Sequence, residues 1–349
     1  MNALAHTPAE AGFRMPAEWE PHSGCWMAWP TRARWRDFEE VCKTVANLAR
    51  TIARCEPVTM AVAPRYLADA TAACGRRVTV LPIPVDDIWI RDTGPAFLLN
   101  REHELAGTTW QFNAWGGKHK RHEADSALAS RILDHLSVPR FDASLVNEGG
   151  AFSVDGEGTV LTTESVLLNR NRNPRLSRSA VEKRLLEFTG ARKVVWLPGN
   201  PMEKVTDGHV DGIAVFARPG VVIAELTTDR DDPDYECLQG NLRVLRLATD
   251  AKGRHFEIFT ITRPRWNLLW PRDFAASYIN FYIANGNVIV PQFGDDRSAM
   301  DAASTISLAF PNRDVVLVRI DAIAAHGGGI HCVTQQQPAG KTNRTATTP

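Results

Sequence analysis

The sequence lacks several features by which whole classes of protein are recognised. It contains no run of about 18 apolar residues, so we expect no transmembrane helix. Lysine plus arginine and aspartate plus glutamate number 40 each, so no excess of positive charge points to nucleic acid. Residues 1–14 show no basic start followed by an apolar block, which argues against a signal peptide. We therefore expect a cytoplasmic protein that binds neither membranes nor nucleic acids.

Cysteine is present but shows no regular spacing. The six cysteines are scattered without CxxC motifs, which argues against a zinc site and against a disulfide framework. Such usage is typical of a reducing compartment. Cys42, Cys55 and Cys74 fall in patterns that favour core positions, whereas Cys332 follows a run of three glycines.

Apolar periodicity predicts five substantial helices joined by short β-rich runs. The helices are expected at residues 36–54, 122–136, 177–188, 233–248 and 297–309, with a shorter one at 64–73. Strands are expected at residues 58–62, 77–81, 159–163, 192–197, 213–217, 221–225, 256–261, 278–283, 288–291 and 314–320. We expect Asp232 to cap the fourth helix, with Pro233 in its first position. Gly190 is expected just past the end of the third helix.

The spacing of these elements predicts a repeated unit. The last four helices begin 55 to 64 residues apart, and each interval holds one helix and about three strands. Five α/β units of ββαβ type would fill residues 1–338 as a single domain. The alternative is a doubly wound parallel sheet. Hairpin turns at 218–220 and 285–286 count against it, because parallel strands need crossover connections. Residues 339–349 form a polar tail that we expect to be disordered.

The most informative stretch is residues 326–335, where Cys332 follows three glycines. Glycines remove Cβ atoms, so backbone or substrate can approach closely there. A thiol that can be reached and that has a lowered pKa is a nucleophile. The alternative is a tight turn beside a small core cysteine, and this stretch alone does not decide between the two interpretations.

Three further polar segments carry carboxylates or an imidazole. In an extended segment, Asp92 points away from Arg91, so that one of the two is a site residue and the other forms an ion pair. Glu148 precedes two glycines, which suits a carboxylate that faces a ligand. Each segment alone is also compatible with a structural role, as a strand-end salt bridge or a plain turn.

The third of these segments contains His209 and Asp211, which share one face of an extended chain. The pair suits an imidazole that transfers protons and a carboxylate that holds a substrate. It also suits a metal, but a third ligand at the right spacing is missing. His331 would point away from Cys332 in an extended chain, and His326 is not obviously within reach. We therefore prefer His209 as the acid/base partner of the thiol.

One chemistry accounts for these residues. A planar guanidinium has five N–H donors that pair with carboxylates, here those of Asp92, Glu148 and Asp211. Cys332 would attack the central carbon, and His209 would protonate the departing ammonia. The resulting thiouronium would be hydrolysed by a water that His209 activates, which gives a urea. No metal and no organic cofactor is required.

The motifs resemble those of the agmatine deiminase and bacterial peptidylarginine deiminase family, within the guanidine-modifying (pentein) superfamily. They are residues 19–30, 89–95, 112–118, 147–150, 169–174, 208–211, 277–282, 328–332 and 334–337. The resemblance implies a five-bladed α/β propeller, the pentein fold, with a central active site. It implies Cys332 as the nucleophile, His209 as the acid/base, and Asp92 and Asp211 as a guanidinium clamp.

The resemblance also suggests supporting roles. Glu148 would orient His209 or the substrate, Trp89 would line the site, and Asn280 is a further candidate for substrate contact. Cys25 lies in a shared motif but is expected to be structural. A homodimer is expected only from the resemblance.

The implied activity is hydrolytic deimination of a small cationic guanidino substrate, with agmatine as first choice and N-carbamoylputrescine and ammonia as products. One departure is Lys204, because a second cation is an unfavourable neighbour for the distal ammonium of agmatine. Glu203 and Asp207 are candidates to bind that ammonium. The alternatives are deimination of peptidyl arginine, of free or modified arginine or of another guanidino metabolite, amidinotransfer through the same thiouronium, and a non-catalytic binding module on this fold.

Overall fold

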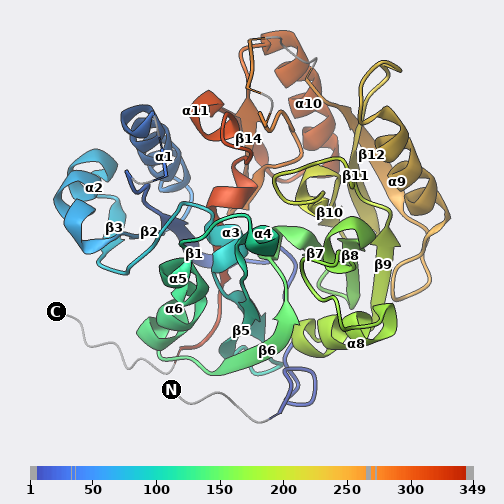
Figure 1. Ribbon diagram of the computed structural model, residues 1–349, viewed down its shortest axis with the longest axis horizontal. Helices are drawn as coiled ribbons and strands as arrows, with labels where there is room; N and C mark the ends of the chain where they lie inside the picture. Colours follow the sequence, from blue (N-terminus) through green and yellow to red (C-terminus); the bar gives the residue numbers. More distant parts are fainter. Residues whose placement is uncertain (1–5, 33, 36, 265–268, 272, 343–349) are drawn as a thin grey trace.

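The structure is a computed structural model that describes residues 6–32, 34–35, 37–264, 269–271 and 273–342. Within these residues the strands form five small sheets arranged around a common centre, and the long helices lie on the outside (Figure 1). In the described part of the chain, no helix combines the length and apolar character needed to cross a membrane.

Strands from both ends of the chain build the first sheet. Its order is β16-β1-β2-β3, with β16 antiparallel to β1 and the other neighbours parallel. These strands are β1 (His22–Ala28), β2 (Val58–Ala61), β3 (Val78–Leu81) and β16 (Gln335–Pro338). The connecting helices are α1 (Phe38–Ile52) and α2 (Leu67–Cys74), and the turn η1 (Pro64–Tyr66) precedes α2. The last strand of the chain therefore closes the ring of sheets against the first.

Each of the other four sheets has three strands, the first two antiparallel and the last two parallel. In chain order they are β4 (Ala96–Leu99), β5 (Leu105–Gln111), β6 (Arg140–Val146); β7 (Phe152–Val154), β8 (Thr159–Thr163), β9 (Lys193–Leu197); β10 (Ala214–Arg218), β11 (Val221–Leu226), β12 (Glu257–Thr262); and β13 (Tyr282–Ala284), β14 (Asn287–Gln292), β15 (Asp314–Arg319). A hairpin cannot join two parallel strands, so a helix crosses over within each sheet. These helices are α6 (Leu128–Leu136), α8 (Arg178–Thr189), α9 (Tyr235–Leu247) and α10 (Asp296–Ala309). The predicted five-bladed α/β propeller of ββαβ-type units is confirmed.

Short helical turns occupy the centre and the connecting loops. They are α3 (Ile90–Thr93), α4 (Ala114–Gly117), α5 (Glu123–Ser126), α7 (Glu164–Leu167), α11 (Asp321–Ala324), η2 (Gly149–Ala151), η3 (Val210–Gly212) and η4 (His331–Val333). Among them α3 packs against η2 and η4, and η2 packs against η3. Four sequence-distant turns therefore meet at one place in the fold.

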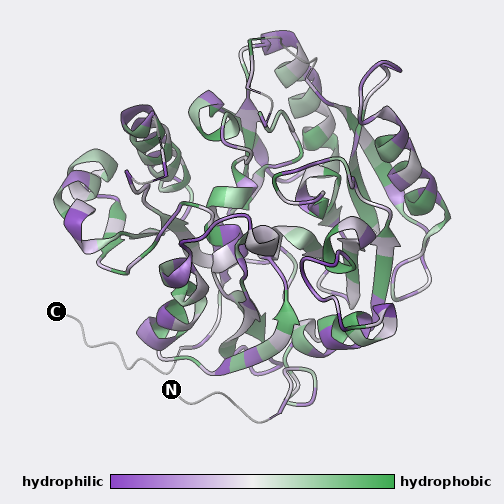
Figure 2. Ribbon diagram, in the orientation of Figure 1, coloured by the Kyte–Doolittle hydropathy of each residue, from purple (hydrophilic) through white to green (hydrophobic). Residues whose placement is uncertain are grey.

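Burial of apolar side chains fixes how the outer helices sit on the sheets. In α1, Val41, Val45, Leu48 and Ile52 recur three and four residues apart and are completely buried. The outer helices carry hydrophilic and hydrophobic residues in alternation (Figure 2). Each outer helix therefore covers its sheet with one apolar stripe. The short turns that form the site lie in the middle of the ring of sheets.

Several predicted element boundaries need correction. The helix expected at 122–136 is divided into α5 and α6, and α9 begins only at Tyr235 with Asp234 at its cap position. Asp232 is not the cap, because its Oδ1 accepts a hydrogen bond of 2.9 Å from the backbone N–H of Asp234 in the preceding turn. Gly190 does end α8 with a left-handed conformation, as predicted. Arg36, the first residue of the helix expected at 36–54, lies outside the described residues.

The strand expected at 278–283 is confirmed only at its end, because β13 begins at Tyr282. Before it the chain turns, and the backbone carbonyl of Asn280 accepts a hydrogen bond of 3.1 Å from His331 N–H. At the other end of the chain, Ala339 and Lys341 donate backbone hydrogen bonds to Pro21 and His103. The last part of the predicted tail, residues 343–349, lies outside the described residues.

Candidate active site

Gly150 in η2 marks the point where three predicted site residues meet. A Cβ atom on Gly150 would lie 2.7 Å from Nδ1 of His209, 2.9 Å from Oδ2 of Asp211 and 2.9 Å from Oδ1 of Asp92. Real Cβ atoms do not approach other atoms that closely, so only glycine fits at this position. The backbone N–H of Gly150 also donates a hydrogen bond of 2.9 Å to Oδ1 of Asp92. The glycines after Glu148 thus let one imidazole and two carboxylates converge.

Helical turns, and not extended strands, present these side chains. Residues 90–93 form α3 and residues 210–212 form η3, so the strand-face argument for Asp92 and Asp211 was wrong in its geometry. The site role of one of Arg91 and Asp92 stays a prediction, and the structure separates the two side chains. Arg91 donates a hydrogen bond of 2.8 Å to Gln336 and lies 3.5 Å from Glu18, while Asp92 faces Gly150.

Asp92 is held in a buried environment rich in negative charge. The indole N–H of Trp115 donates a hydrogen bond of 2.8 Å to its Oδ2. Burial raises the pKa of Asp92, His209 opposes this rise, and Asp211 and Glu148 add to it. Trp115 has a φ of 53°, a left-handed conformation that is costly for a bulky residue. Its motif was recognised in the sequence, but the contact of its indole with Asp92 was not foreseen.

His209 lies between the carboxylates of Asp92 and Glu148. Its Nδ1 is 3.8 Å from Oδ1 of Asp92, and its Nε2 is 3.5 Å from Oε2 of Glu148. Burial alone would lower the pKa of His209, but Asp92, Glu148 and Asp211 outweigh it and raise the pKa to about 9. The imidazole is therefore protonated at neutral pH and can donate a proton to a leaving group.

Arg172 supports Glu148 from behind. Its Nε donates a hydrogen bond of 2.7 Å to Oε1 of Glu148, and both side chains are completely buried. A second guanidinium nitrogen of Arg172 lies 2.8 Å from Oδ2 of Asp207. The motif around Arg172 is recognisable in the sequence, but it predicts no role for this residue. Its signal was a basic residue among asparagines in a loop, which does not by itself reveal the buried carboxylate partner.

Cys332 belongs to the same cluster and is half-buried, not sealed in the core. Its Sγ lies 3.6 Å from Oδ2 of Asp211 and 3.4 Å from Oδ1 of Asn280. Burial, together with the charges of Asp211 and Asp92, raises the pKa of the thiol well above its usual value. The lowered thiol pKa expected from the sequence is therefore wrong for the unliganded protein.

The glycines before Cys332 allow two predicted site residues to pack closely. A Cβ on Gly328 would lie 2.1 Å from the ring of Trp89, and a Cβ on Gly329 would lie 2.3 Å from Oδ1 of Asn280. Asn280 also accepts a hydrogen bond of 3.4 Å from the backbone N–H of Cys332. The structure thus places Trp89 and Asn280 beside the loop that carries the thiol.

Two histidines near Cys332 differ from each other in position. His331 was predicted to point away, but residues 331–333 form the turn η4, and its Nδ1 lies 2.9 Å from Oδ2 of Asp211. The prediction assumed an extended chain and was wrong. His326 pairs at 2.8 Å with Asp37 and takes no part in the cluster.

The two carboxylates proposed for a distal ammonium already have partners. Glu203 accepts hydrogen bonds from the backbone N–H groups of Thr206 and Gly208 at 2.8 and 3.1 Å. Asp207 lies 2.9 Å from Nζ of Lys118 and 2.8 Å from Arg172. Both side chains therefore stabilise the loop that leads into His209.

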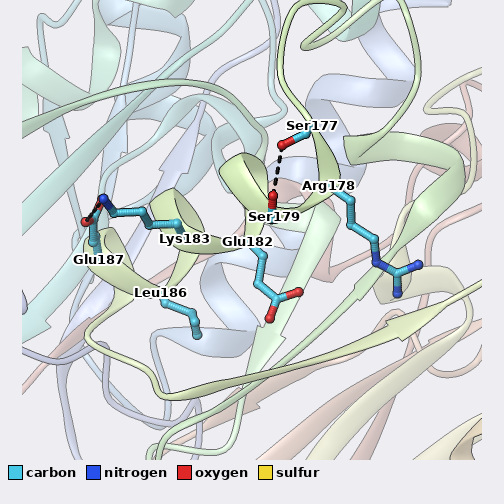
Figure 3. A pocket seen from close by; sticks show the side chains of 7 residues that line it. All are labelled: Ser177, Arg178, Ser179, Glu182, Lys183, Leu186 and Glu187. Carbon is cyan, nitrogen blue, oxygen red and sulfur yellow. Dashed lines mark hydrogen bonds and ion pairs between the residues drawn. The ribbon is translucent and has the colours of Figure 1, made fainter.

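A shallow pocket on the outside of α8 is separate from this cluster. It is lined by Ser177, Arg178, Ser179, Glu182, Lys183, Leu186 and Glu187 (Figure 3). None of them belongs to the predicted site. Among the described residues, no group of three or more histidine, cysteine, aspartate or glutamate side chains is arranged to hold a metal ion.

Known proteins match this chain over almost its whole length. A family model described as Porphyromonas-type peptidyl-arginine deiminase matches residues 14–338. The agmatine deiminase of Stutzerimonas stutzeri is 42% identical, over 97% of this chain and 99% of that protein. The agmatine deiminase of Medicago truncatula is 41% identical, over 97% and 100%. The solved structure of the agmatine deiminase of Enterococcus faecalis superposes with a TM-score of 0.93 at 35% identity, covering 97% of this chain and 99% of that one.

Proposed function

The chain belongs to the family of Porphyromonas-type peptidyl-arginine deiminases, and from this premise we propose that it hydrolyses agmatine to N-carbamoylputrescine and ammonia. One observation carries the chemistry. The buried carboxylates of Asp92 and Asp211 converge beside the Cys332 thiol and the His209 imidazole. Two carboxylates with a thiol within reach are the groups that a planar guanidinium cation and its electron-poor carbon require.

Substrate binding itself would activate the thiol. Asp92 and Asp211 disfavour a thiolate in the free protein, because it would add a third negative charge. A guanidinium bound between them supplies a positive charge and lowers the thiol pKa. In this proposal the thiol proton is released to water as the cation binds, and the nucleophile forms only when its target is in place.

The remaining steps follow from the protonation state of His209. The thiolate of Cys332 forms a C–S bond to the guanidinium carbon, and protonated His209 gives its proton to a terminal nitrogen. Ammonia leaves, which produces a cationic thiouronium and a neutral imidazole. His209 then takes one proton from the water that attacks this carbon, and the C–S bond breaks to give the urea and the Cys332 thiol, which receives the second proton of that water. Glu148, fixed by Arg172, orients and charges the imidazole.

The relatives named agmatine deiminase favour agmatine as the substrate. Recognition of the distal ammonium of agmatine needs a separate test. Because Glu203 and Asp207 are engaged within their loop, neither is proposed as the partner of the distal ammonium. Ammonia and ureido product should be measured for agmatine, free arginine and an arginine-containing peptide. We expect the highest kcat/KM for agmatine. Absence of ammonia release from every guanidino compound, in a folded sample, would contradict the proposed function.

Two other functions use the same groups. An amidinotransferase would pass the thiouronium to an amine in place of water. Supplying glycine or ornithine and finding a new guanidino product would favour it. A non-catalytic binding module would not require a thiol and an imidazole at the same two carboxylates, and this chain has both.

Activation of the thiol by a bound cation predicts how Cys332 reacts with alkylating agents. 2-Chloroacetamidine carries a planar cation, and 2-chloroacetamide is its neutral counterpart with the same leaving group. At pH 7 we expect the amidine to alkylate Cys332 at least about 100-fold faster, because it pairs with the carboxylates and lowers the thiol pKa. Mass spectrometry of the labelled peptide gives both rates. Equal rates, or labelling spread evenly over all six cysteines, would contradict the clamp.

The location of the protein in the cell and its oligomeric state do not follow from the chemistry of the site. We propose a cytoplasmic location, which is supported by six cysteines that are free thiols in the structure. The homodimer suggested by the family resemblance stays a prediction, and sedimentation of the purified protein would test it.

A further inference from the structure

His331, which immediately precedes the nucleophile, lies between two carboxylates. Its Nδ1 is 2.9 Å from Oδ2 of Asp211, and its Nε2 is 2.9 and 3.1 Å from the two oxygens of Glu18. The imidazole is almost completely buried, and the Glu18 side chain is only 14% exposed. These contacts join the segment before β1 to η3 and η4 through one ring.

The contacts define the charge of the ring. An ionised carboxylate only accepts hydrogen bonds, so each ring nitrogen that faces one must carry a proton. With an ionised carboxylate at each ring nitrogen, the contacts fit His331 as an imidazolium. Burial and the nearby Arg91 lower the pKa of His331, but Glu18 and Asp211 outweigh them and raise it. Glu18 matches this arrangement, because His331 and Arg91 overcome its burial and lower its pKa to about 2.

The imidazolium lies where the cluster needs positive charge. Oδ2 of Asp211 faces both His331 and the thiol of Cys332, and Oδ1 of Asp92 approaches the same point beside Gly150. Two buried carboxylates close to each other tend to share one proton. A shared proton would remove half of the charge that a guanidinium must meet. Although burial raises the pKa of Asp211, the hydrogen bond from His331 and the positive charges around it outweigh burial and lower that pKa.

We propose that His331 is a positioning residue, a buried imidazolium braced by Glu18 that keeps Asp211 ionised and oriented so that Asp92 and Asp211 together bind the guanidinium. The proposal rests on the deiminase function proposed above. The charged groups around the ring are Glu18 and Arg91 on one side and Asp211 on the other. The charges of Asp92 and His209 influence Asp211, and the charge of His22 influences Glu18.

The first test replaces His331 with glutamine, which can still donate a hydrogen bond to Asp211 but carries no charge. In His331→Gln we expect Asp92 and Asp211 to share a proton at neutral pH. The ratio of the variant KM to the wild-type KM for agmatine should then rise by about tenfold for each pH unit below the raised pKa of the pair, and should return toward one near pH 9. Release of the thiol proton on binding affects both proteins equally and cancels in this ratio. The control His326→Gln changes the same residue type at the surface and should leave the profile unaltered.

An equal increase of KM at every pH would indicate a merely structural role and would overturn the proposal, as would an unchanged KM. Turnover of the wild-type protein shows whether the proposed function or only the proposed role of His331 has failed. If the wild-type protein converts another guanidino compound and not agmatine, the same profiles are measured with that compound. If it converts none, the proposed function fails first.

The second test measures the charge of His331 directly and does not depend on turnover. In protein labelled with 15N-histidine, the ring nitrogens of His331 should both be protonated at pH 7.5, and Glu18→Gln should lower the pKa of the ring. The signals are assigned by their loss in His331→Gln, or in His331→Asn if the glutamine variant does not fold. A neutral His331 tautomer in the wild-type protein at pH 7.5 would overturn the proposal.

Discussion

Cys332→Ala is expected to lower kcat for agmatine by at least about 10⁴-fold and to leave the fold unchanged. The variant has no sulfur to form the C–S bond, so only the clamp and the acid/base remain. In the wild-type protein Cys332 is half-buried and lies outside the fully buried core, and its Sγ contacts Asp211 and Asn280. Loss of this sulfur should therefore hardly change the thermal midpoint of unfolding. Ammonia release and thermal unfolding measure the two effects.

The carboxylates of the clamp are untouched in Cys332→Ala, so calorimetry should still detect agmatine binding. Cys237→Ala is the matched control, because this thiol is also half-buried but lies on the outer helix α9. It should retain wild-type turnover. Turnover by Cys332→Ala within tenfold of the wild type would show that the sulfur is not the nucleophile.

Asp211→Asn is expected to lower kcat/KM by about 10²- to 10³-fold. The change is isosteric but removes one of the two charges that face the guanidinium, and losing one partner of a buried charge pair costs about 2–5 kcal/mol. Tenfold in rate corresponds to about 1.4 kcal/mol. The variant should also lose the preference of Cys332 for 2-chloroacetamidine over 2-chloroacetamide. Steady-state kinetics and the two alkylation rates measure these effects.

Asp211→Asn also changes the acceptor of the hydrogen bond from His331, which weakens the support of the imidazole. A control must therefore show that the loss of kcat/KM arises from the site and not from the removal of any aspartate. Asp321→Asn changes a half-buried aspartate whose partner Arg319 lies on the surface, and it should leave both measurements unchanged. Near-normal kinetics in Asp211→Asn would count decisively against the clamp.

The sequence predicted the repeat and the chemical groups because both are local properties. Apolar side chains recur every three to four residues in a helix such as α1, and turn residues mark the hairpins, so ββαβ units follow from short stretches of chain. No ranges were predicted for the strands β1, β4, β5, β6, β7 and β16. The residues of β16 are mostly glutamines, and it is a strand only through pairing with β1. Cys332, His209, Asp211 and Asp92 stand in distinctive motifs and were named without any knowledge of their distances.

Only the tertiary structure decided the protonation of the site residues and the direction in which their side chains point. The extended-chain assumption pointed His331 away from Cys332, whereas in the turn η4 its ring faces Asp211. The thiol pKa, expected to be lowered, is raised, because burial and the carboxylates of Asp211 and Asp92, which are distant in the sequence, disfavour the thiolate. Through-space electrostatics depends on burial and distance between segments, and neither is encoded in the spacing of residues along one segment. The sequence thus determined which groups are present, and the fold determined which of them carry a proton.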